Sequence, residues 1–526
     1  MSVRAMIGAM ALGAALLSSA TPVAAQAQRT ITVDVARAGA PIDRFFDLSV
    51  GSDYPGTLMR DDSMAQLTTA QAELGFRTIR FHAIFHDVLR TVRVEKGRTI
   101  YDWSGIDRLY DQLRARNLRP FVELGFTPEA LKTSDNSIFY WKGNTSHPQI
   151  DGWRKLIDAF VRHVRQRYGV DEVRQWYFEV WNEPNLDGFW EGADQKAYFQ
   201  LYDVTAKAIK AIDPALRVGG PSTAGAAWVP EFLAYAAAHR VPVDFVTTHT
   251  YGVSGGFLDE QGKEDNKLSA DPDAVIADVR NVRAQIQASA FRDVPLFFTE
   301  WSTSYSPRDS VHDSYISAAY ILTKLKAVEG IVQGMSYWTY SDLFEEPGPP
   351  TAPFEGGFGL MNPQSIRKPA WFAYKYLHAL QGRAVPTVDP HSWASSDGRG
   401  VRLLVWDWHQ PVQPVSNRSF FTRIVPAEKS APAAVHVVGL TPGRYRLRTY
   451  RTGYRHNDAY SAYIDMGSPR TLDSGQVARL QAMTQDGPEA DEMVSVAADG
   501  RLDRTLAFDS NDVMLVTVDR VDGKSQ

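Results

Sequence analysis

The chain has 526 residues, of which 44% are hydrophobic and 11% aromatic, so it is long enough to bury a large core. Its formal net charge of −5 is small for this length, and the basic residues are scattered, which argues against a nucleic-acid partner. It contains no cysteine, which excludes disulfides, thiol catalysis and cysteine-based metal sites.

The first 25 residues have the pattern of a cleaved secretory signal peptide. They carry an arginine, an apolar run from Ala5 to Leu17, and the small residues Val23 and Ala25 before the expected cleavage point. The apolar run is shorter than the roughly 20 residues that a membrane crossing needs, so we expect export rather than anchoring. The predicted location is therefore secreted, in a bacterial periplasm, without a membrane partner.

Apolar, β-prone runs alternate with helical patterns in the next part of the chain. The strand candidates are residues 45–51, 77–82, 118–124, 176–182, 216–221, 243–249, 295–301 and 332–338. Apolar residues recur at three- and four-residue spacing, as on amphipathic helices, in residues 62–75, 104–117, 151–169, 196–212, 272–289, 314–330 and 368–382.

This alternation predicts an α/β fold, a (β/α)8 TIM barrel over residues 40–382, because its strands are apolar throughout rather than alternating. An open doubly wound sheet is the alternative. That fold would normally show a glycine-rich phosphate turn after its first strand, and the sequence has none there.

After Gly382 the pattern changes to alternating β-prone runs with little helical periodicity. These runs are residues 401–408, 433–440, 444–452 and 513–521. They predict a C-terminal accessory β-sandwich over residues 383–526, joined by an early strand within residues 29–39.

Polar and aromatic residues stand where the expected barrel strands end, which is where such barrels place their active sites. These residues are His82, Asn182, Glu183, His249, Tyr251, Glu300 and Trp338. Glu183 and Glu300 would converge across the barrel mouth, and hydrolysis of a glycosidic bond needs such a pair of carboxyl groups. The alternatives are helix capping by Glu183 and a structural ion pair of Glu300. Because both carboxyl groups stand at strand ends, the catalytic interpretation is favoured over these alternatives.

Neighbouring residues have candidate roles in sugar binding. Asn182 can donate a hydrogen bond to the hydroxyl beside the anomeric carbon. The aromatic residues that can stack on sugar faces, with core packing as the alternative, are Trp190, Tyr251, Tyr305 and Trp338. We expect no metal, because the histidines and Glu300 lack a tight ligand spacing, and no cofactor. Glu123 and Glu179 lie inside strands, where we expect structural ion pairs.

Two stretches, "FEVWNEPN" (178–185) and "FFTEWSTSY" (297–305), resemble glycoside hydrolase family 39. This family comprises retaining barrel enzymes of clan A and includes β-xylosidases and α-L-iduronidases. Further similar stretches follow in the family's order: "RFHAIFHD" (80–87), "RPFVELGFTPE" (119–129), "VGGPSTAG" (218–225), "DFVTTHTYG" (244–252), "SYWTYSDLFEE" (336–346), "GGFGLMN" (356–362) and "RKPAWFAY" (367–374). "YRHNDAYSAYIDMGSP" (454–469) is similar to part of the family's accessory sandwich.

The resemblance implies a role for each candidate residue. Glu183 would be the acid/base and Glu300 the nucleophile of a double displacement through a covalent glycosyl-enzyme intermediate. The first sugar subsite would be lined by His82, Asn182, His249, Tyr251, Tyr305 and Trp338. Glu345 and Glu346 match positions that hold sugar hydroxyls in the xylosidases, with Glu346 the expected ligand. We also expect the negative charge of Glu300 to raise the pKa of Glu183.

The expected reaction is removal of single β-D-xylose units from the non-reducing end of an oligosaccharide or an aryl glycoside. The family's iduronidases have a lysine two residues after the histidine that ends the sixth strand, where this sequence has Tyr251, which brings no positive charge to a uronate. Lys263 or Arg308 would have to supply that charge. An α-L-arabinosidase or an iduronidase-like enzyme is the alternative. A non-catalytic sugar-binding protein would be expected to lack one of the two carboxyl groups.

Overall fold

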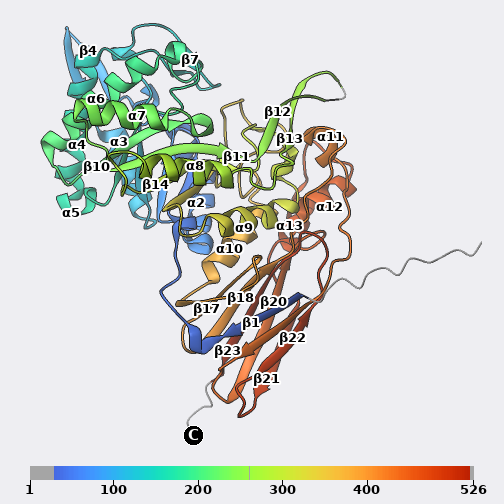
Figure 1. Ribbon diagram of the computed structural model, residues 1–526. Coiled ribbons are helices and arrows are strands. Elements are labelled where there is room, and N and C mark those ends of the chain that lie inside the picture. Colours follow the sequence, from blue (N-terminus) through green and yellow to red (C-terminus); the bar gives the residue numbers. More distant parts are fainter. Residues whose placement is uncertain (1–28, 260, 522–526) are drawn as a thin grey trace, which may run out of the picture.

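The computed structural model describes residues 29–259 and 261–521. The expected signal peptide lies outside these residues. Within them, eight strands close into a parallel barrel, as predicted, and each lies within one of the runs identified from the sequence or overlaps it (Figure 1). In order around the barrel they are β2 (Ser49–Ser52), β3 (Thr78–Phe81), β6 (Arg119–Leu124), β9 (Tyr177–Val180), β10 (Arg217–Thr223), β11 (Phe245–Tyr251), β14 (Leu296–Ser302) and β15 (Gly334–Tyr337).

Helices surround the barrel and cover its strands. The larger ones are α2 (Asp61–Leu74), α3 (Ser104–Arg114), α4 (Ile150–Tyr168), α6 (Gln195–Ile212), α7 (Val229–His239), α8 (Ile276–Gln287), α9 (Ile316–Val328) and α10 (Pro369–Ala379). In α4 the buried residues Trp153, Leu156, Ile157, Phe160, Val161 and Val164 follow the three- and four-residue spacing of one helix face. Helix α7 was not predicted, because its alanine-rich sequence has only a short apolar stripe.

The barrel interior is apolar at its base and polar above. Leu48, Phe121, Phe245 and Phe297 pack together at the amino-terminal ends of the strands. Two residues further along the same strands stand Glu123 on β6 and Thr299 on β14, which face the same side because side chains alternate along a strand. An aromatic floor therefore supports a buried polar layer beneath the barrel mouth.

The C-terminal part forms two sheets. One has six strands in the order β16 (Arg383–Val385), β17 (Ser392–Ser396), β18 (Gly400–Trp406), β23 (Val513–Arg520), β20 (Gly443–Thr452) and β21 (Ala490–Val496). The other has three strands, in the order β1 (Arg29–Asp34), β19 (Ala433–Val438) and β22 (Leu502–Leu506). Strand β1 thus pairs in parallel with β19, although the two strands lie far apart in the sequence.

Within the six-stranded sheet, β17, β18 and most of β23 are buried on both faces. On β18, Leu403 and Val405 pack into the core between the two sheets, whereas Leu404 and Trp406 join the core of the barrel. Trp406 also donates a hydrogen bond from Nε1 to Thr323 of α9, at 2.9 Å. The run "LLVW" (403–406) is therefore apolar at successive positions, because its side chains contact two cores, one on each side.

The tail contains helices that were not predicted. They are α11 (Asn417–Phe421), α12 (Ala459–Asp465) and α13 (Ser474–Met483). Asp473 and Gln476 form a reciprocal capping box at the start of α13, a sequence signal that was overlooked. A hairpin of β12 (Val253–Leu258) and β13 (Glu264–Leu268) also projects beyond the barrel strands, and it too was missed. No helix of the described residues is long and apolar enough to cross a membrane.

Replacing Leu404 with alanine should destabilise the protein by about 2–5 kcal/mol, because this fully buried side chain would leave a cavity between the sheet and the barrel. The measurement is the shift in the urea unfolding midpoint. Val388→Ala is the control, since Val388 is 100% exposed and its truncation should change stability by less than about 0.5 kcal/mol. Equal midpoints for the two variants would contradict the packing described.

Candidate active site

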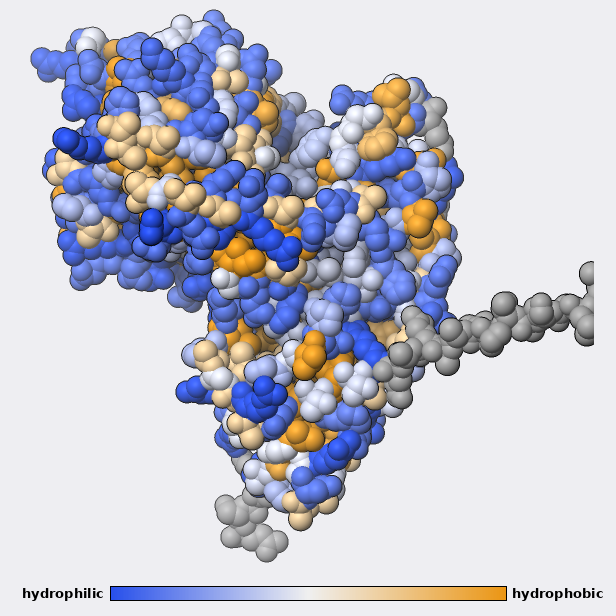
Figure 2. Space-filling view, in the orientation of Figure 1, coloured by the Kyte–Doolittle hydropathy of each residue, from blue (hydrophilic) through white to orange (hydrophobic). Residues whose placement is uncertain are grey.

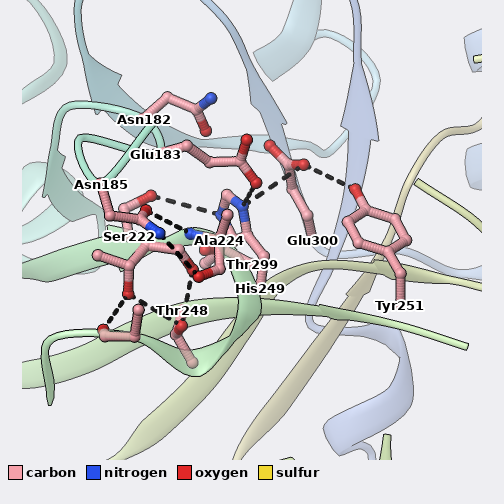
Figure 3. A network of polar contacts seen from close by, with 12 residues as sticks. Asn182, Glu183, Asn185, Ser222, Ala224, Thr248, His249, Tyr251, Thr299 and Glu300 are labelled. Atoms are coloured by element: carbon pink, nitrogen blue, oxygen red, sulfur yellow. Dashed lines mark hydrogen bonds and ion pairs between the residues drawn. The ribbon is translucent and has the colours of Figure 1, made fainter. Parts of the chain in front are cut away.

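Two carboxyl groups converge at the carboxyl ends of the barrel strands, as Figure 3 shows. Glu183 follows β9, Glu300 belongs to β14, and His249 on β11 lies between them. One side-chain oxygen of each glutamate and a ring nitrogen of His249 all lie within 4.8 Å of one another. Retaining glycosidases place their two carboxyl groups about 5–5.5 Å apart, whereas inverting enzymes separate them by about 6.5–9.5 Å. The arrangement therefore has the spacing of direct nucleophilic attack.

Glu183 lies in an environment that favours the protonated form of its carboxyl group. Its backbone has a φ of 46°, and its N–H donates to Ser222 O at 2.8 Å, which fixes the turn after β9. The side chain shares a 2.8 Å hydrogen bond with Nδ1 of His249. Burial raises the pKa of Glu183 to about 7. The direction agrees with our expectation, but the main cause is desolvation rather than the charge of Glu300.

Glu300 lies instead among donors that suit a carboxylate. Arg80 donates from Nη1 to Oε1 at 2.7 Å, and the Tyr251 hydroxyl donates to Oε2 at 2.8 Å. The Glu300 side chain is 6% exposed, so these contacts replace most of its water. The two glutamates therefore differ in a physical sense, since only one of them has a cation in contact.

Arg80 is a central residue of the site that was not predicted from the sequence. It is fully buried on β3 and donates from Nε to Glu179 at 2.6 Å and from Nη2 to Asn182 Oδ1 at 2.7 Å. It also lies 3.0 Å from Glu123, so both expected ion pairs of the strand interiors form with this arginine. A signal was present: Arg80 stands two residues before His82 in an apolar strand, and so faces the same side.

His249 is a neutral imidazole at the centre of the site. It is completely buried, and burial lowers its pKa to about 4 despite the nearby carboxylate of Glu300. Its Nε2 lies 3.4 Å from the Ser222 hydroxyl. His249 therefore orients Glu183 by a hydrogen bond without adding a positive charge.

His82 is held between two carboxyl groups. Nδ1 lies 2.8 Å from Glu123, and Nε2 lies 3.0 Å from Glu346. Burial alone would lower the pKa of His82, but the Glu123 and Glu346 carboxylates raise it well above its ordinary value. Burial also raises the pKa of Glu346 to about 8. Glu346 thus lies beside the site, where the sequence analysis expected it.

Glu345 points elsewhere, although it neighbours Glu346. Its carboxylate pairs with Arg60 at 2.8 Å, and its backbone N–H donates to Asp53 at 2.8 Å. The other Asp53 oxygen accepts from Nε1 of Trp141 at 3.0 Å. Asp53 follows β2 and was not singled out from the sequence, yet it ties two loops of the barrel mouth together.

The candidate aromatic residues divide into three groups. Trp338 is 2% exposed and packs on His82 with ring centroids 4.7 Å apart, so it contacts a residue of the site. Tyr305 is 50% exposed, next to Tyr251, and its hydroxyl donates to Asn266 at 2.7 Å. Trp190 is 1% exposed and packs on Trp181 and His147, so for this residue core packing is correct.

Among the described residues, Glu183, His249 and Glu300 are the one group close enough to hold a metal ion. The sequence did not reveal this grouping, because the three residues come from different strands. Their place coincides with the pair of carboxyl groups, and acid/base hydrolysis of a glycoside needs no metal. The absence of a metal requirement stays a prediction.

Known proteins that are similar to this chain include β-xylosidases. The chain is 34% identical to a β-xylosidase of Caldicellulosiruptor saccharolyticus over 462 residues, which cover 86% of this chain and 90% of that protein. It is 42% identical to a β-xylosidase of Geobacillus stearothermophilus over 339 residues, which cover 63% and 67%. A crystal structure described as a monomeric β-xylosidase from Caulobacter crescentus CB15 has 65% identity and a TM-score of 0.93, and the match covers 94% of this chain and 100% of that one.

The sequence model of Glycosyl hydrolases family 39 matches residues 29–503, which is most of the chain. With its carboxyl pair at the barrel mouth, the protein belongs to glycosyl hydrolases family 39 and is a glycoside hydrolase.

Proposed function

We propose that this glycoside hydrolase removes single β-D-xylose units from non-reducing ends with retention of configuration. The observation that carries the mechanism is the close approach of Glu183 and Glu300, whose oxygens lie within 4.8 Å. The β-xylosidases similar to this chain support the choice of sugar. A purely sugar-binding role is the weaker alternative, because both carboxyl groups are present in distinct environments suited to acid and nucleophile.

In the first step, Glu183 donates its proton to the glycosidic oxygen while Glu300 attacks the anomeric carbon. The bond to the leaving group breaks, and an ester forms between the sugar and Glu300. In the second step, the ionised Glu183 takes a proton from water, the water oxygen attacks the anomeric carbon, and the ester breaks. Arg80 and Tyr251 hold Glu300 in place for both steps.

The first sugar would be held by groups around this pair. Because Asn182 Oδ1 accepts a hydrogen bond from Arg80, the amide NH2 of Asn182 remains to donate to the hydroxyl beside the anomeric carbon. His82 and Glu346 would bind other hydroxyls, with Trp338 beneath them. We assign Tyr305 a place at the edge of this subsite, since half of its surface is exposed.

The charges around the site favour a neutral sugar over a uronate. A buried carboxylate of substrate needs a cation or several donors. Arg80 and His82 are already paired with protein carboxylates, and Arg308 lies 3.5 Å from Glu355. Lys263 is exposed near the turn of the β12–β13 hairpin. We therefore keep the iduronidase reading as the alternative, and α-L-arabinosidase activity as a side reaction on a pentose with similar hydroxyls.

Variants of the two glutamates should respond differently to the leaving group. Glu300→Ala should lose on the order of 10⁴-fold or more in kcat on every substrate, because the nucleophile is gone. Glu183→Ala should retain the first step on 2,4-dinitrophenyl β-D-xyloside, whose leaving group needs no proton, and azide should restore turnover as β-xylosyl azide. Product analysis by NMR checks the configuration. Equal losses on activated and unactivated substrates, or an inverted azide product, would contradict the assignment.

The fall of kcat/KM at alkaline pH, the alkaline limb of the pH profile, should follow the ionisation of Glu183. The acid works only when protonated, and burial raises its pKa to about 7, so kcat/KM on a substrate with a poor leaving group should fall as pH rises through about 7. The comparison is 2,4-dinitrophenyl β-D-xyloside, for which the same limb should be weaker. A limb of the same size for both substrates would contradict the role of Glu183.

The choice of sugar can be measured directly. We expect kcat/KM on 4-nitrophenyl β-D-xyloside to exceed that on an aryl α-L-iduronide by at least about 100-fold, because the uronate would lie unpaired near Glu346. An aryl α-L-arabinopyranoside should fall between them. A preference for the iduronide would overturn the proposed substrate.

A further inference from the structure

A short segment of the accessory part reaches the wall of the active site. Residues 413–421, here called the bracing segment, leave the six-stranded sheet after β18 and end in α11. Figure 1 shows α11 beside β12 and β13, at the side of the molecule where the barrel strands end. Figure 2 shows a hollow between the loops of the barrel and the lobe that contains this hairpin. The segment thus supports a wall of that hollow from outside.

Asn417 makes the central contacts of the bracing segment. It is fully buried, although it begins an "NRS" glycosylation pattern. Its Oδ1 accepts from Leu268 N at 2.9 Å and from Gln413 Nε2 at 2.8 Å, and its Nδ2 donates to Asp309 at 2.8 Å. One amide therefore connects the end of β13 to the loop that follows β14.

Arg418 adds two contacts to the same hairpin. Its backbone N–H donates to Asp265 at 2.9 Å, and its guanidinium donates to Asp259 at 2.8 Å. Asp309 extends the connection, since its own N–H donates to Gly356 O at 2.9 Å in the loop after β15. The bracing segment is therefore linked to the loops that follow three barrel strands, β11, β14 and β15.

The hairpin continues this chain of contacts to the catalytic centre. Asn266 follows Asp265, and its Oδ1 accepts from the Tyr305 hydroxyl at 2.7 Å. The Tyr305 ring lies edge-on to Tyr251, with centroids 6.3 Å apart, and Tyr251 donates to Glu300. Tyr251 belongs to a barrel strand, however, so its place does not depend on the hairpin. The part that the bracing segment controls is the hairpin with Tyr305.

We propose that Asn417 is a positioning residue for the leaving-group side of the substrate. Through β13 and Asn266 it fixes the exposed ring of Tyr305 and the hairpin as the wall along which the further sugar units of an oligosaccharide lie. The first sugar depends instead on barrel strands and Arg80. This inference rests on the proposed xylosidase function, and it gives the accessory sandwich a part in substrate selection.

A reciprocal exchange tests the proposal. Asn417→Asp keeps the acceptor for Leu268 but places a carboxylate against that of Asp309. The double variant Asn417→Asp with Asp309→Asn restores the hydrogen bond in the reverse direction, because residue 309 then donates and residue 417 accepts. The measurement is kcat/KM on xylotriose and on 4-nitrophenyl β-D-xyloside, together with Tm. We expect Asn417→Asp to lower the ratio of the two values by about tenfold, mainly through KM, and the double variant to return it to within about threefold.

A control separates positioning from loss of stability. Asn457 donates to Arg451 O at 3.0 Å and to Asp486 at 2.8 Å, within the tail, so Asn457→Ala should lower Tm without changing the substrate ratio. If Asn417→Asp is insoluble, Arg418→Ala replaces it, because that side chain is 42% exposed, and the ratio should fall in the same direction. In Tyr305→Phe, which lacks the contact to Asn266, Asn417→Asp should change the ratio less than in the wild type.

The outcomes are distinct. A lower Tm with an unchanged ratio would overturn the positioning role, as would a reduced ratio that the reciprocal exchange fails to restore. If the wild type hydrolyses neither xyloside, the proposed function fails first, and that result appears before any variant is compared.

Discussion

The buried guanidinium of Arg80 is the group on which the proposed catalytic centre depends. Glu123, Glu179 and Glu300 all lie within 3.0 Å of it, in an interior from which water is excluded. Burial favours the neutral form of a carboxyl group, yet the pKa of Glu123 is lowered because His82 and Arg80 outweigh that effect. Removing the arginine would leave several carboxylates unpaired in a low dielectric, which is far costlier than losing one surface ion pair. The same cation thus stabilises the barrel interior and aligns Glu300.

The two glutamates of the proposed catalytic pair have different surroundings because of this asymmetry. Glu300 contacts both Arg80 and the Tyr251 hydroxyl, and these stabilise an ionised oxygen. Glu183 has a neutral histidine as its hydrogen-bond partner, and burial raises its pKa to about 7. A buried carboxyl group beside an uncharged partner suits a proton donor, whereas a carboxyl group that accepts from a guanidinium and a phenol suits a nucleophile. The roles therefore follow from neighbours on other strands rather than from the glutamates themselves.

The sequence predicts the parts of this site that depend on strand periodicity. The barrel, its strands and the residues at their carboxyl ends could be located, because each apolar run marks a strand and polar residues follow several of these runs. Arg80 and Asp53 were missed, because each acts through a contact with a residue that is hundreds of positions away in the sequence. Arg80 contacts Glu300, and Asp53 accepts from the backbone of Glu345. Trp190 shows the converse: it neighbours the catalytic stretch but turns into the core. The hairpin and α11 also escaped prediction, because their short elements are stabilised by contacts with each other rather than by local propensity.

The barrel strands hold the two carboxyl groups, whereas loops carry the groups around them. The proposed catalytic pair stands on β14 and just after β9, above an aromatic floor, so its geometry is set by the barrel itself. The groups that meet the rest of the substrate lie on loops, and these are fixed by contacts such as Glu346 with His82 and Asn266 with Tyr305. Loop changes can alter the sugar that binds without disturbing the two carboxyl groups. Because one such loop is held by residues from the accessory part, substitutions far outside the barrel can act on selectivity as well as on stability.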